Sequence, residues 1–378
     1  MAYENICIGC LAEKENASIC PVCGFDEKQY SASPLFLPPR TFLDHRYLIG
    51  RVLGNGGFGV TYLALDFVLQ IKVAIKEFLP RSLAIRVPGT NRVSAHQGAE
   101  ALFGSGRKQF IEEARALAQF NQNPAVVTVN DFVSENNTAY LVMEYLEGMT
   151  LKTYLERRMD TIAPELAVAA VLPVIAGLEE VHSRKMLHRD ISPGNIFITN
   201  KRQSKMIDFG AARYLVGKER QNLSVLFKPG YTPWEQYSQY GKQGPWTDVY
   251  AMGATLYRAI TGQIPVEAFC RIEQDVLLPP SRLGVVIASE LERVILQALA
   301  VEIEARYQSM AELYDALIKA APRAASIPDI LQATFPAGKN KVKSLLSPIP
   351  SDQGRTLTLK PSGASGESQK SSDANGSV

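Results

Sequence analysis

The sequence has no excess of charge of one sign. Its 378 residues include 40 Lys and Arg against 38 Asp and Glu, which gives a formal net charge of +2. Proteins that bind nucleic acid or an anionic membrane surface through their electrostatic field usually carry a clear excess of basic residues. We therefore expect no nucleic-acid partner for this chain.

The sequence also lacks the features of a secreted or membrane-spanning protein. Its first ten residues contain Glu4 and no basic region, which argues against a secretory signal. The longest uncharged apolar run, residues 166–178, is shorter than the ~18 residues of a spanning helix and contains Pro173. We expect a cytoplasmic protein with no membrane span.

Aromatic residues are missing after Phe335. Residues 344–378 consist mainly of Ser, Gly, Pro and charged residues, a composition that cannot offset its chain entropy by burial. We predict a linker and disordered tail over residues 322–378. Thr356 and Thr358 could accept phosphate there, or the tail could serve only solubility.

Cysteine is scarce and unevenly placed. Four of the five cysteines form two C-x2-C pairs near the N-terminus: Cys7, Cys10, Cys20 and Cys23. Without a secretion signal, such pairs indicate a metal site rather than disulfides, and four thiolates make a closed, structural Zn²⁺ site. An iron–sulfur centre or reduced thiols are the alternatives. Residues 1–30 resemble a zinc ribbon, whose metal would supply about 10 kcal/mol of folding free energy, and which could bind a regulatory partner.

A glycine-rich turn follows a linker at residues 31–45. It joins two predicted strands and consists of Gly54, Asn55, Gly56, Gly57, Phe58 and Gly59. A dinucleotide-binding fingerprint needs a helix directly after the glycines, whereas here β-branched and aromatic residues continue as a second strand. A third strand then carries Ala74 and Lys76.

The central stretch of the sequence is residues 188–210. Asp190 and Asn195 lie five residues apart in a polar loop, a predicted hairpin follows, and Asp208 begins Asp-Phe-Gly210. The hairpin should place these groups side by side. The alternative is that Asp190 and Asn195 only cap the loop.

The HRDxxxxN and DFG residues resemble the catalytic core of a protein kinase, with the glycine turn folded over ATP. The resemblance implies an α+β bilobal fold over residues 46–321, ATP as substrate and Mg²⁺ or Mn²⁺ as cofactor. It also implies that Asp190 accepts the hydroxyl proton, that Asn195 and Asp208 hold the metal, and that Lys76 contacts the α- and β-phosphates. Periodicity of the predicted helix over residues 107–120 places Glu113, not Glu112, on the inward face, as the partner of Lys76.

Further positions follow from the same resemblance. We expect the adenine to be bound at Ala74, at a gatekeeper Met143, and through backbone groups of Glu144 and Leu146, although an ordinary strand end fits those residues equally well. We also expect a buried ion pair between Glu235 and Arg306. Asp248 should brace the catalytic loop. Residues 79–107 form either a regulatory element or a tolerated surface insertion.

One position departs from the family. Ser192 stands where Ser/Thr kinases generally have a lysine, and Lys228 stands where a threonine normally faces that lysine. We expect the two to have exchanged places, so that loss of Lys228 lowers the rate by about 10² to 10³; a solvated loop lysine is the alternative. Arg189 also fits activation by phosphorylation, with Ser224 as acceptor; the alternative is that Arg189 only caps the loop.

The sequence thus predicts a bacterial protein Ser/Thr kinase of the eukaryotic type, acting on protein substrates and, as a homodimer, on itself. A pseudokinase that binds nucleotide and recruits partners through its ribbon is the main alternative, supported by Ser192. A small-molecule kinase is disfavoured by the long activation segment, residues 211–235, and by Glu235.

Overall fold

The structure is a computed structural model that describes residues 3–14, 17–157, 161–209, 213–214, 228–238 and 240–326. Several predicted features lie outside these residues: Gly210, Ser224, Thr356, Thr358 and the tail beyond residue 326.

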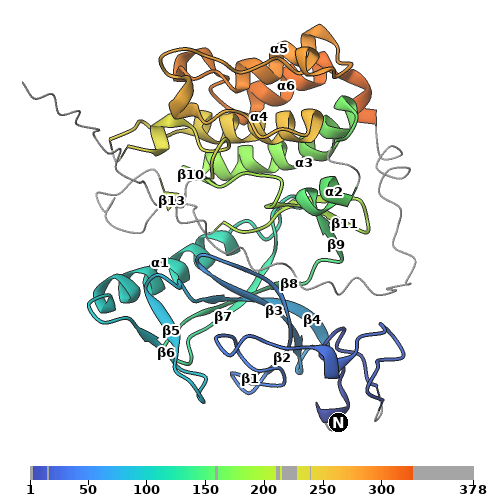
Figure 1. Cartoon of the computed structure of the whole chain (residues 1–378), viewed down its shortest axis with the longest axis vertical. Coiled ribbons are helices and arrows are strands. Elements are labelled where there is room, and N and C mark those ends of the chain that lie inside the picture. The colour runs from blue at the N-terminus through green and yellow to red at the C-terminus, as the bar shows by residue number, and fades with distance from the viewer. Residues whose placement is uncertain are drawn as a thin grey trace, which may run out of the picture. The chain divides into compact units, whose positions relative to one another are not determined.

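The N-terminal lobe is built on an antiparallel sheet of six strands with the order β1-β2-β3-β4-β8-β7 (Figure 1). The strands are β1 (Phe42–Leu43), β2 (Tyr47–Gly56), β3 (Gly59–Asp66), β4 (Ile71–Phe78), β7 (Val129–Val133) and β8 (Tyr140–Glu144). The strand, glycine turn and strand of the prediction are therefore confirmed.

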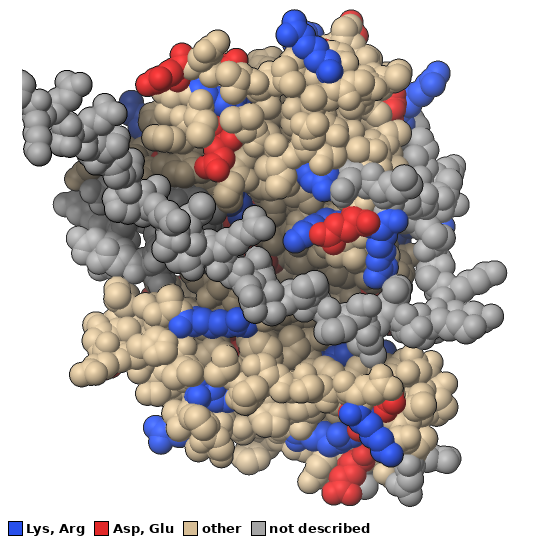
Figure 2. Space-filling model, in the orientation of Figure 1, with Lys and Arg blue, Asp and Glu red and all other residues tan. Residues whose placement is uncertain are grey.

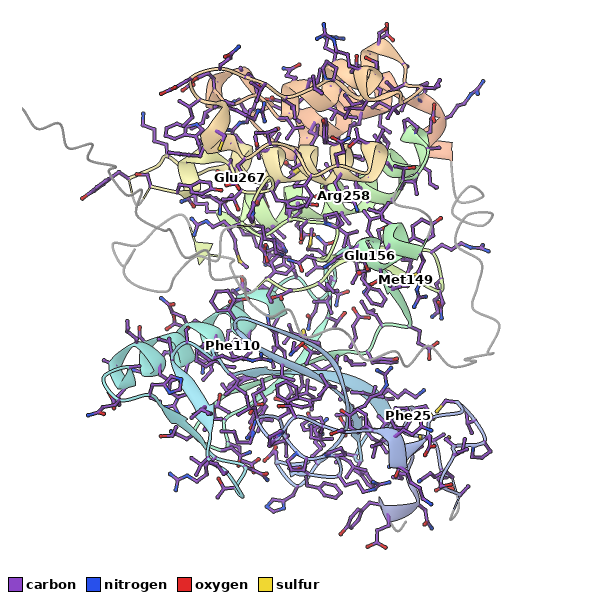
Figure 3. All side chains as sticks on the ribbon, viewed as in Figure 1. Phe25, Phe110, Met149, Glu156, Arg258 and Glu267 are labelled. Carbon is purple, nitrogen blue, oxygen red and sulfur yellow. The ribbon has the colours of Figure 1, made fainter. Side chains whose placement is uncertain are left out.

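Helix α1 (Glu100–Ala118) packs on this sheet. Its buried face includes Phe110 and Leu117, as the periodicity predicts, and Figure 3 labels Phe110 on this helix. The helix begins at Glu100, seven residues before the predicted start at residue 107. The prediction began too late because Gly104 and Gly106 look like turn residues in the sequence. Tertiary packing outweighs a glycine's poor helix propensity of about 1 kcal/mol, since Gly106 is buried in the helix.

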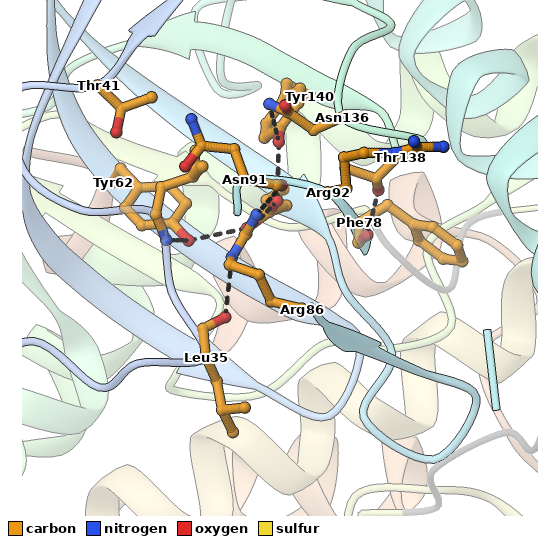
Figure 4. Close-up of polar contacts among 12 residues, drawn as sticks. Leu35, Thr41, Tyr62, Phe78, Arg86, Asn91, Arg92, Asn136, Thr138 and Tyr140 are labelled. Carbon is orange, nitrogen blue, oxygen red and sulfur yellow. Dashed lines mark hydrogen bonds and ion pairs between the residues drawn. The ribbon is translucent and has the colours of Figure 1, made fainter. Parts of the chain in front are cut away.

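The insertion that precedes α1 contains a small hairpin, β5 (Ala84–Arg86) with β6 (Val93–Ala95). Arg86 anchors it through an ion pair with Glu77 of β4 at 2.6 Å, and both side chains are at most 2% exposed. Tyr62 and Tyr140 donate to the same carboxylate at 2.8 and 2.9 Å. The Arg86 Nε donates to the Leu35 carbonyl at 3.2 Å (Figure 4). The insertion is thus fastened to the sheet by a buried network.

The segment predicted as a linker, residues 31–45, packs on the lobe. Leu37 and Leu43 are fully buried, and the Leu37 N–H donates to the Tyr62 hydroxyl at 3.0 Å. The ribbon before it contains the 3₁₀ turns η1 (Tyr3–Asn5) and η2 (Glu27–Gln29) and lies against β2 and β3 through an apolar contact described below.

The C-terminal lobe is mainly helical, with α2 (Leu151–Arg157), α3 (Pro164–Ser183), α4 (Pro245–Thr261), α5 (Ser289–Ala298) and α6 (Met310–Ala320). Pro164 occupies the first turn of α3, Gly262 ends α4 at a φ of 75°, and Ser309 caps α6. Helix α3 is long and apolar enough to span a membrane, but 72% of its apolar window is buried inside the fold.

Short strands also cross this lobe. They are β9 (Gly148–Thr150), β10 (Met186–Leu187), β11 (Ile196–Thr199), β12 (Ser204–Met206) and β13 (Arg213–Tyr214). The 3₁₀ turns are η3 (Trp234–Gln236), η4 (Ala268–Arg271), η5 (Pro280–Leu283), η6 (Ile303–Ala305) and η7 (Pro322–Ser326). The predicted hairpin corresponds to β11 and β12. Strands β9, β10 and β13 have only two or three residues each, which is too short an alternation to be recognised in a sequence.

Candidate active site

The catalytic loop follows β10 and is held by Asp248 of α4. Asp248 accepts hydrogen bonds from the backbone N–H groups of His188 and Arg189, both at 2.8 Å. A third contact joins Asp248 Oδ2 to His182 Nε2 at 2.8 Å. Burial alone would raise the pKa of Asp248, but the hydrogen bond and charge of His182 outweigh it and hold that pKa below its usual range. The expected bracing by Asp248 is confirmed.

The β11–β12 hairpin brings two candidate metal ligands together, as predicted. Asn195 precedes β11 and Asp208 follows β12, and the Ile207 N–H donates to the Asn195 carbonyl at 2.9 Å. Asn195 Nδ2 donates to Asp190 twice, to the backbone carbonyl at 2.7 Å and to Oδ2 at 2.9 Å. Hydrogen bonds therefore hold Asp190, Asn195 and the start of the Asp208 segment close together.

Lys76 reaches this group from β4 in the other lobe. Its ammonium pairs with Asp208 Oδ1, and its side chain is 12% exposed. Burial alone would lower the pKa of Lys76, but the charges of Asp208 and Glu113 outweigh it, so that the pKa is raised. Glu113 is half-buried and Glu112 exposed, which agrees with the face predicted from periodicity. Lys76 therefore pairs with Asp208 and stays a cation under the charges of both carboxylates.

Lys228 contacts the catalytic loop from the segment that precedes η3. Its Nζ is 2.7 Å from Asp190 Oδ1 and donates to Ser192 Oγ at 3.1 Å. The Ser192 side chain is buried, and the Thr232 hydroxyl accepts the Lys228 N–H at 3.0 Å. An ammonium therefore contacts both the candidate base and the serine that replaces the family's lysine.

The glycine-rich turn connects β2 to β3. Gly56 pairs with Gly59 across the turn, and Asn55 pairs with Val60. A Cβ at Gly59 would lie 1.9 Å from the Glu77 carbonyl oxygen, so only glycine fits there. Gly56 faces open space, with nothing within 4 Å of a built Cβ. Its backbone is accessible to a ligand.

The predicted adenine site lies where β4 and β8 pair. Ala74 is opposite Met143 in this ladder. Glu144 Oε1 accepts the Thr128 N–H at 2.8 Å and pairs with Lys205 of β12, so its carboxylate is engaged within the protein. Any contact of Glu144 with a nucleotide would therefore use its backbone, as expected for it and for Leu146.

Two ion-pair partners outside the catalytic loop are also resolved. Glu235 and Arg306 pair at 2.7 Å with both side chains fully buried, which confirms the prediction. Sequence reasoning missed Gln236, whose Nε2 donates to the Arg189 carbonyl at 3.2 Å. It also missed His182, because a single His in an apolar helix gives no indication of its partner.

The four N-terminal cysteines meet at one point. Their Sγ atoms all lie within 4.8 Å of one another, with Cys7 to Cys23 at 3.8 Å and Cys10 to Cys20 at 3.7 Å. A tetrahedron with Zn–S bonds of about 2.3 Å has edges of about 3.8 Å, so the donor set fits Zn²⁺. Burial raises the pKa of Cys7 and of Cys23 to about 11. Figure 3 shows Phe25 beside the sulfur atoms of this cluster.

The comparisons with known proteins agree with this geometry. The model of the protein kinase domain family matches residues 47–275. Serine/threonine-protein kinase PknB of Mycolicibacterium smegmatis is 32% identical over 292 residues, 73% of this chain and 43% of that protein. Serine/threonine-protein kinase PrkC of Bacillus subtilis is 30% identical over 283 residues, 73% of this chain and 40% of that protein.

A solved structure described as the PpkA-294 apo form is 33% identical, has a TM-score of 0.65, and covers 75% of this chain and 99% of its own. The chain spans less than half the length of PknB and PrkC. Since the model of the protein kinase domain family matches more than half of the sequence, this chain belongs to the protein kinase family.

Proposed function

We propose that this chain is an ATP-dependent protein kinase that transfers the γ-phosphoryl group of ATP to Ser or Thr hydroxyls of protein substrates. The observation that carries the proposal is the convergence of Asp190, Asn195, Asp208 and Lys76 in one site. The Ser/Thr preference follows from the names of the relatives, PknB and PrkC.

Each group has a role in phosphoryl transfer. Asp190 orients the substrate hydroxyl and takes its proton as the new O–P bond forms and the bond to the ADP oxygen breaks. Lys76 holds the α- and β-phosphates. Asn195 and Asp208 would hold Mg²⁺ or Mn²⁺, which neutralises phosphate charge when bound. Positioning and charge stabilisation account for most of the catalysis in this reaction class.

Lys228 supplies the cation that Ser192 does not. Its ammonium lies 2.7 Å from the carboxylate that receives the hydroxyl, where the transferring phosphoryl group must pass. Lysines in this family generally neutralise that group from the Ser192 position. The contact with Ser192 Oγ supports the same task being performed from the activation segment.

The adenine would bind where Ala74 and Met143 pair, with backbone groups at Glu144 and Leu146. The glycine turn of residues 54–59 would cover the phosphates through its backbone N–H groups. We further propose a cytoplasmic signalling role, with homodimers phosphorylating themselves. On the face drawn in Figure 2, Lys and Arg are interspersed with Asp and Glu, which gives no sign of a nucleic-acid surface there.

The test is transfer of labelled phosphate from ATP with Mg²⁺, to the protein itself and to a generic basic protein, followed by phosphosite mapping. Asp190→Asn keeps the shape of the side chain and removes its basicity, so we expect transfer to be lost. Asp315→Asn, an exposed aspartate of α6, is the matched control and should keep wild-type activity. Equal transfer by Asp190→Asn and wild type would contradict the proposal.

A nucleotide-binding scaffold without transferase activity is the second candidate, and Ser192 is the observation that favours it. ATP binding by the wild type with no transfer to any protein would support the scaffold. Transfer that maps to tyrosine would refute the Ser/Thr assignment alone.

A further inference from the structure

The first cysteine knuckle lies directly against β2, immediately before the glycine turn. The Arg51 N–H donates to the Ile8 carbonyl at 2.8 Å, and Arg51 Nε donates to the Gly9 carbonyl at 3.0 Å. The Val52 N–H donates to the Tyr30 hydroxyl at 3.0 Å. Three hydrogen bonds thus connect the ribbon to the strand that leads to the phosphate-binding turn.

These bonds form where β2 loses its regular partner. The register of β2 against β3 shifts between Ile49 and Val52 and again between Val52 and Gly54. Such bulges leave backbone groups without a ladder partner and allow a strand to bend. The ribbon supplies the missing partner for Arg51, so it stabilises the segment whose shape determines where the glycine turn lies.

The knuckle and β2 are closely packed against each other. A Cβ at Gly50 would lie 2.7 Å from the Ile8 carbonyl oxygen, and one at Gly9 would lie 2.4 Å from the Phe25 ring. An apolar cluster continues the contact: Ile6, Leu11, Leu48 and Leu63 are all at most 7% exposed. A change in the knuckle would therefore be felt by β2, because close-packed groups transmit displacement.

The shape of the knuckle depends on its sulfur atoms. Ile8 and Gly9 are the two residues between Cys7 and Cys10, and the Gly9 N–H donates to Cys7 Sγ at 3.3 Å. The buried cluster of the ribbon is small, comprising Cys7, Ile8, Cys20 and Phe25. So small a core does not hold a fold by itself, and metal binding normally supplies the difference.

We propose that Arg51 is a positioning residue that couples the cysteine cluster to the nucleotide site, so that metal binding and ATP binding are thermodynamically linked. The proposal rests on the proposed function, since it requires ATP at the glycine turn. Metal in the cluster holds the two knuckle carbonyls in place, Arg51 holds β2 to them, and β2 places the turn over the phosphates. The metal can be lost by chelation, or by oxidation of the thiols to disulfides with a disulfide oxidant. Without it the knuckle carbonyls no longer hold Arg51 and β2 in place.

Linkage between two sites is reciprocal, and couplings of 5- to 150-fold are typical. The experiment measures the ATP dissociation constant of the full chain loaded with Zn²⁺ and after metal removal under reducing conditions, with Mg²⁺ restored. It then measures the Zn²⁺ dissociation constant with a chromophoric chelator, with and without ATP. We expect Zn²⁺ to raise ATP affinity at least fivefold and ATP to raise Zn²⁺ affinity by the same factor. Equal ATP affinities in the two forms overturn the proposal.

Two variants of the zinc-loaded chain test whether the coupling passes through the contact between the ribbon and β2. They keep the proposal testable even if the metal-free chain unfolds. Arg51→Met and Tyr30→Phe each remove one side-chain bond across the contact. We expect KM for ATP to rise about three- to tenfold, with kcat within about twofold and one Zn²⁺ retained per chain. Lys72→Met, an exposed residue of β4, is the control. Unchanged KM in both variants refutes the role of the contact, whereas absence of ATP binding by the wild type refutes the proposed function itself.

Discussion

Replacing Lys228 with methionine removes the ammonium that contacts both Asp190 and Ser192. The Lys228 ammonium and the transferring phosphoryl group can be treated as two unit charges about 4 Å apart. Such charges interact by about 4 kcal/mol at an effective dielectric constant of about 20. The Lys228 side chain is 40% exposed, and screening by water reduces this to about 2–3 kcal/mol. Because 1.36 kcal/mol is tenfold in rate, we expect kcat to fall by about 30- to 150-fold.

The assay is the initial rate of phosphate transfer to a protein substrate at saturating ATP, with ATP affinity measured separately. Lys319→Met, an exposed lysine of α6, is the matched control and should leave the rate unchanged. Ser192→Lys combined with Lys228→Met returns an ammonium to the family position, since Ser192 Oγ lies 3.1 Å from the ammonium removed. We expect the double variant to recover to within about tenfold of wild type. A single Lys228→Met rate within about threefold of wild type would refute the reasoning.

Three further outcomes follow from the geometry. Gly59→Ala places a methyl group 1.9 Å from a β4 carbonyl oxygen and should lower the free energy of unfolding by about 1–3 kcal/mol and raise KM for ATP, whereas Gly56→Ala should change stability by less than about 1 kcal/mol; equal urea midpoints for the two would contradict this. Arg306→Met leaves Glu235 buried without its cation and should lower the free energy of unfolding by about 3–5 kcal/mol in urea titrations; a loss below about 1 kcal/mol would be incompatible with that burial. Burial lowers the pKa of His188 below its usual 6.5, so the unfolded chain binds the extra proton first and stability falls as pH drops below about 6.5; His188→Asn should flatten that slope in urea midpoints measured from pH 7 to pH 5.

The sequence predicted best those residues whose type follows from their chemistry. Asp248, Glu235 and Arg306 could be assigned because a buried carboxylate needs a partner, and the family pattern indicates which one. The Lys228 contact with Ser192 followed from the same reasoning about charge.

What the sequence could not predict are contacts made through backbone groups or between distant segments. The carbonyls of Ile8 and Gly9 bind Arg51, and a carbonyl contact leaves no trace in residue type. The pairing of Arg86 with Glu77 depends on how the inserted hairpin folds back on β4, which periodicity does not describe. The predicted start of α1 was too late, because helix propensity depends on the residue alone, whereas the packing that keeps Gly106 helical depends on distant parts of the fold.

The buried pair of Arg86 and Glu77 has a consequence for anyone who shortens this protein. The inserted hairpin looks removable, because its tip is exposed and its ends are close to the sheet. Deleting it would take Arg86 away from the Glu77 carboxylate and leave the hydroxyls of Tyr62 and Tyr140 as the donors that the described residues still offer it. A buried charge without its partner destabilises by about 3–5 kcal/mol, whereas an apolar replacement of both partners is often neutral. A truncated chain should therefore also carry Glu77→Leu or Glu77→Gln, so that the hairpin and the charge it neutralises are removed together.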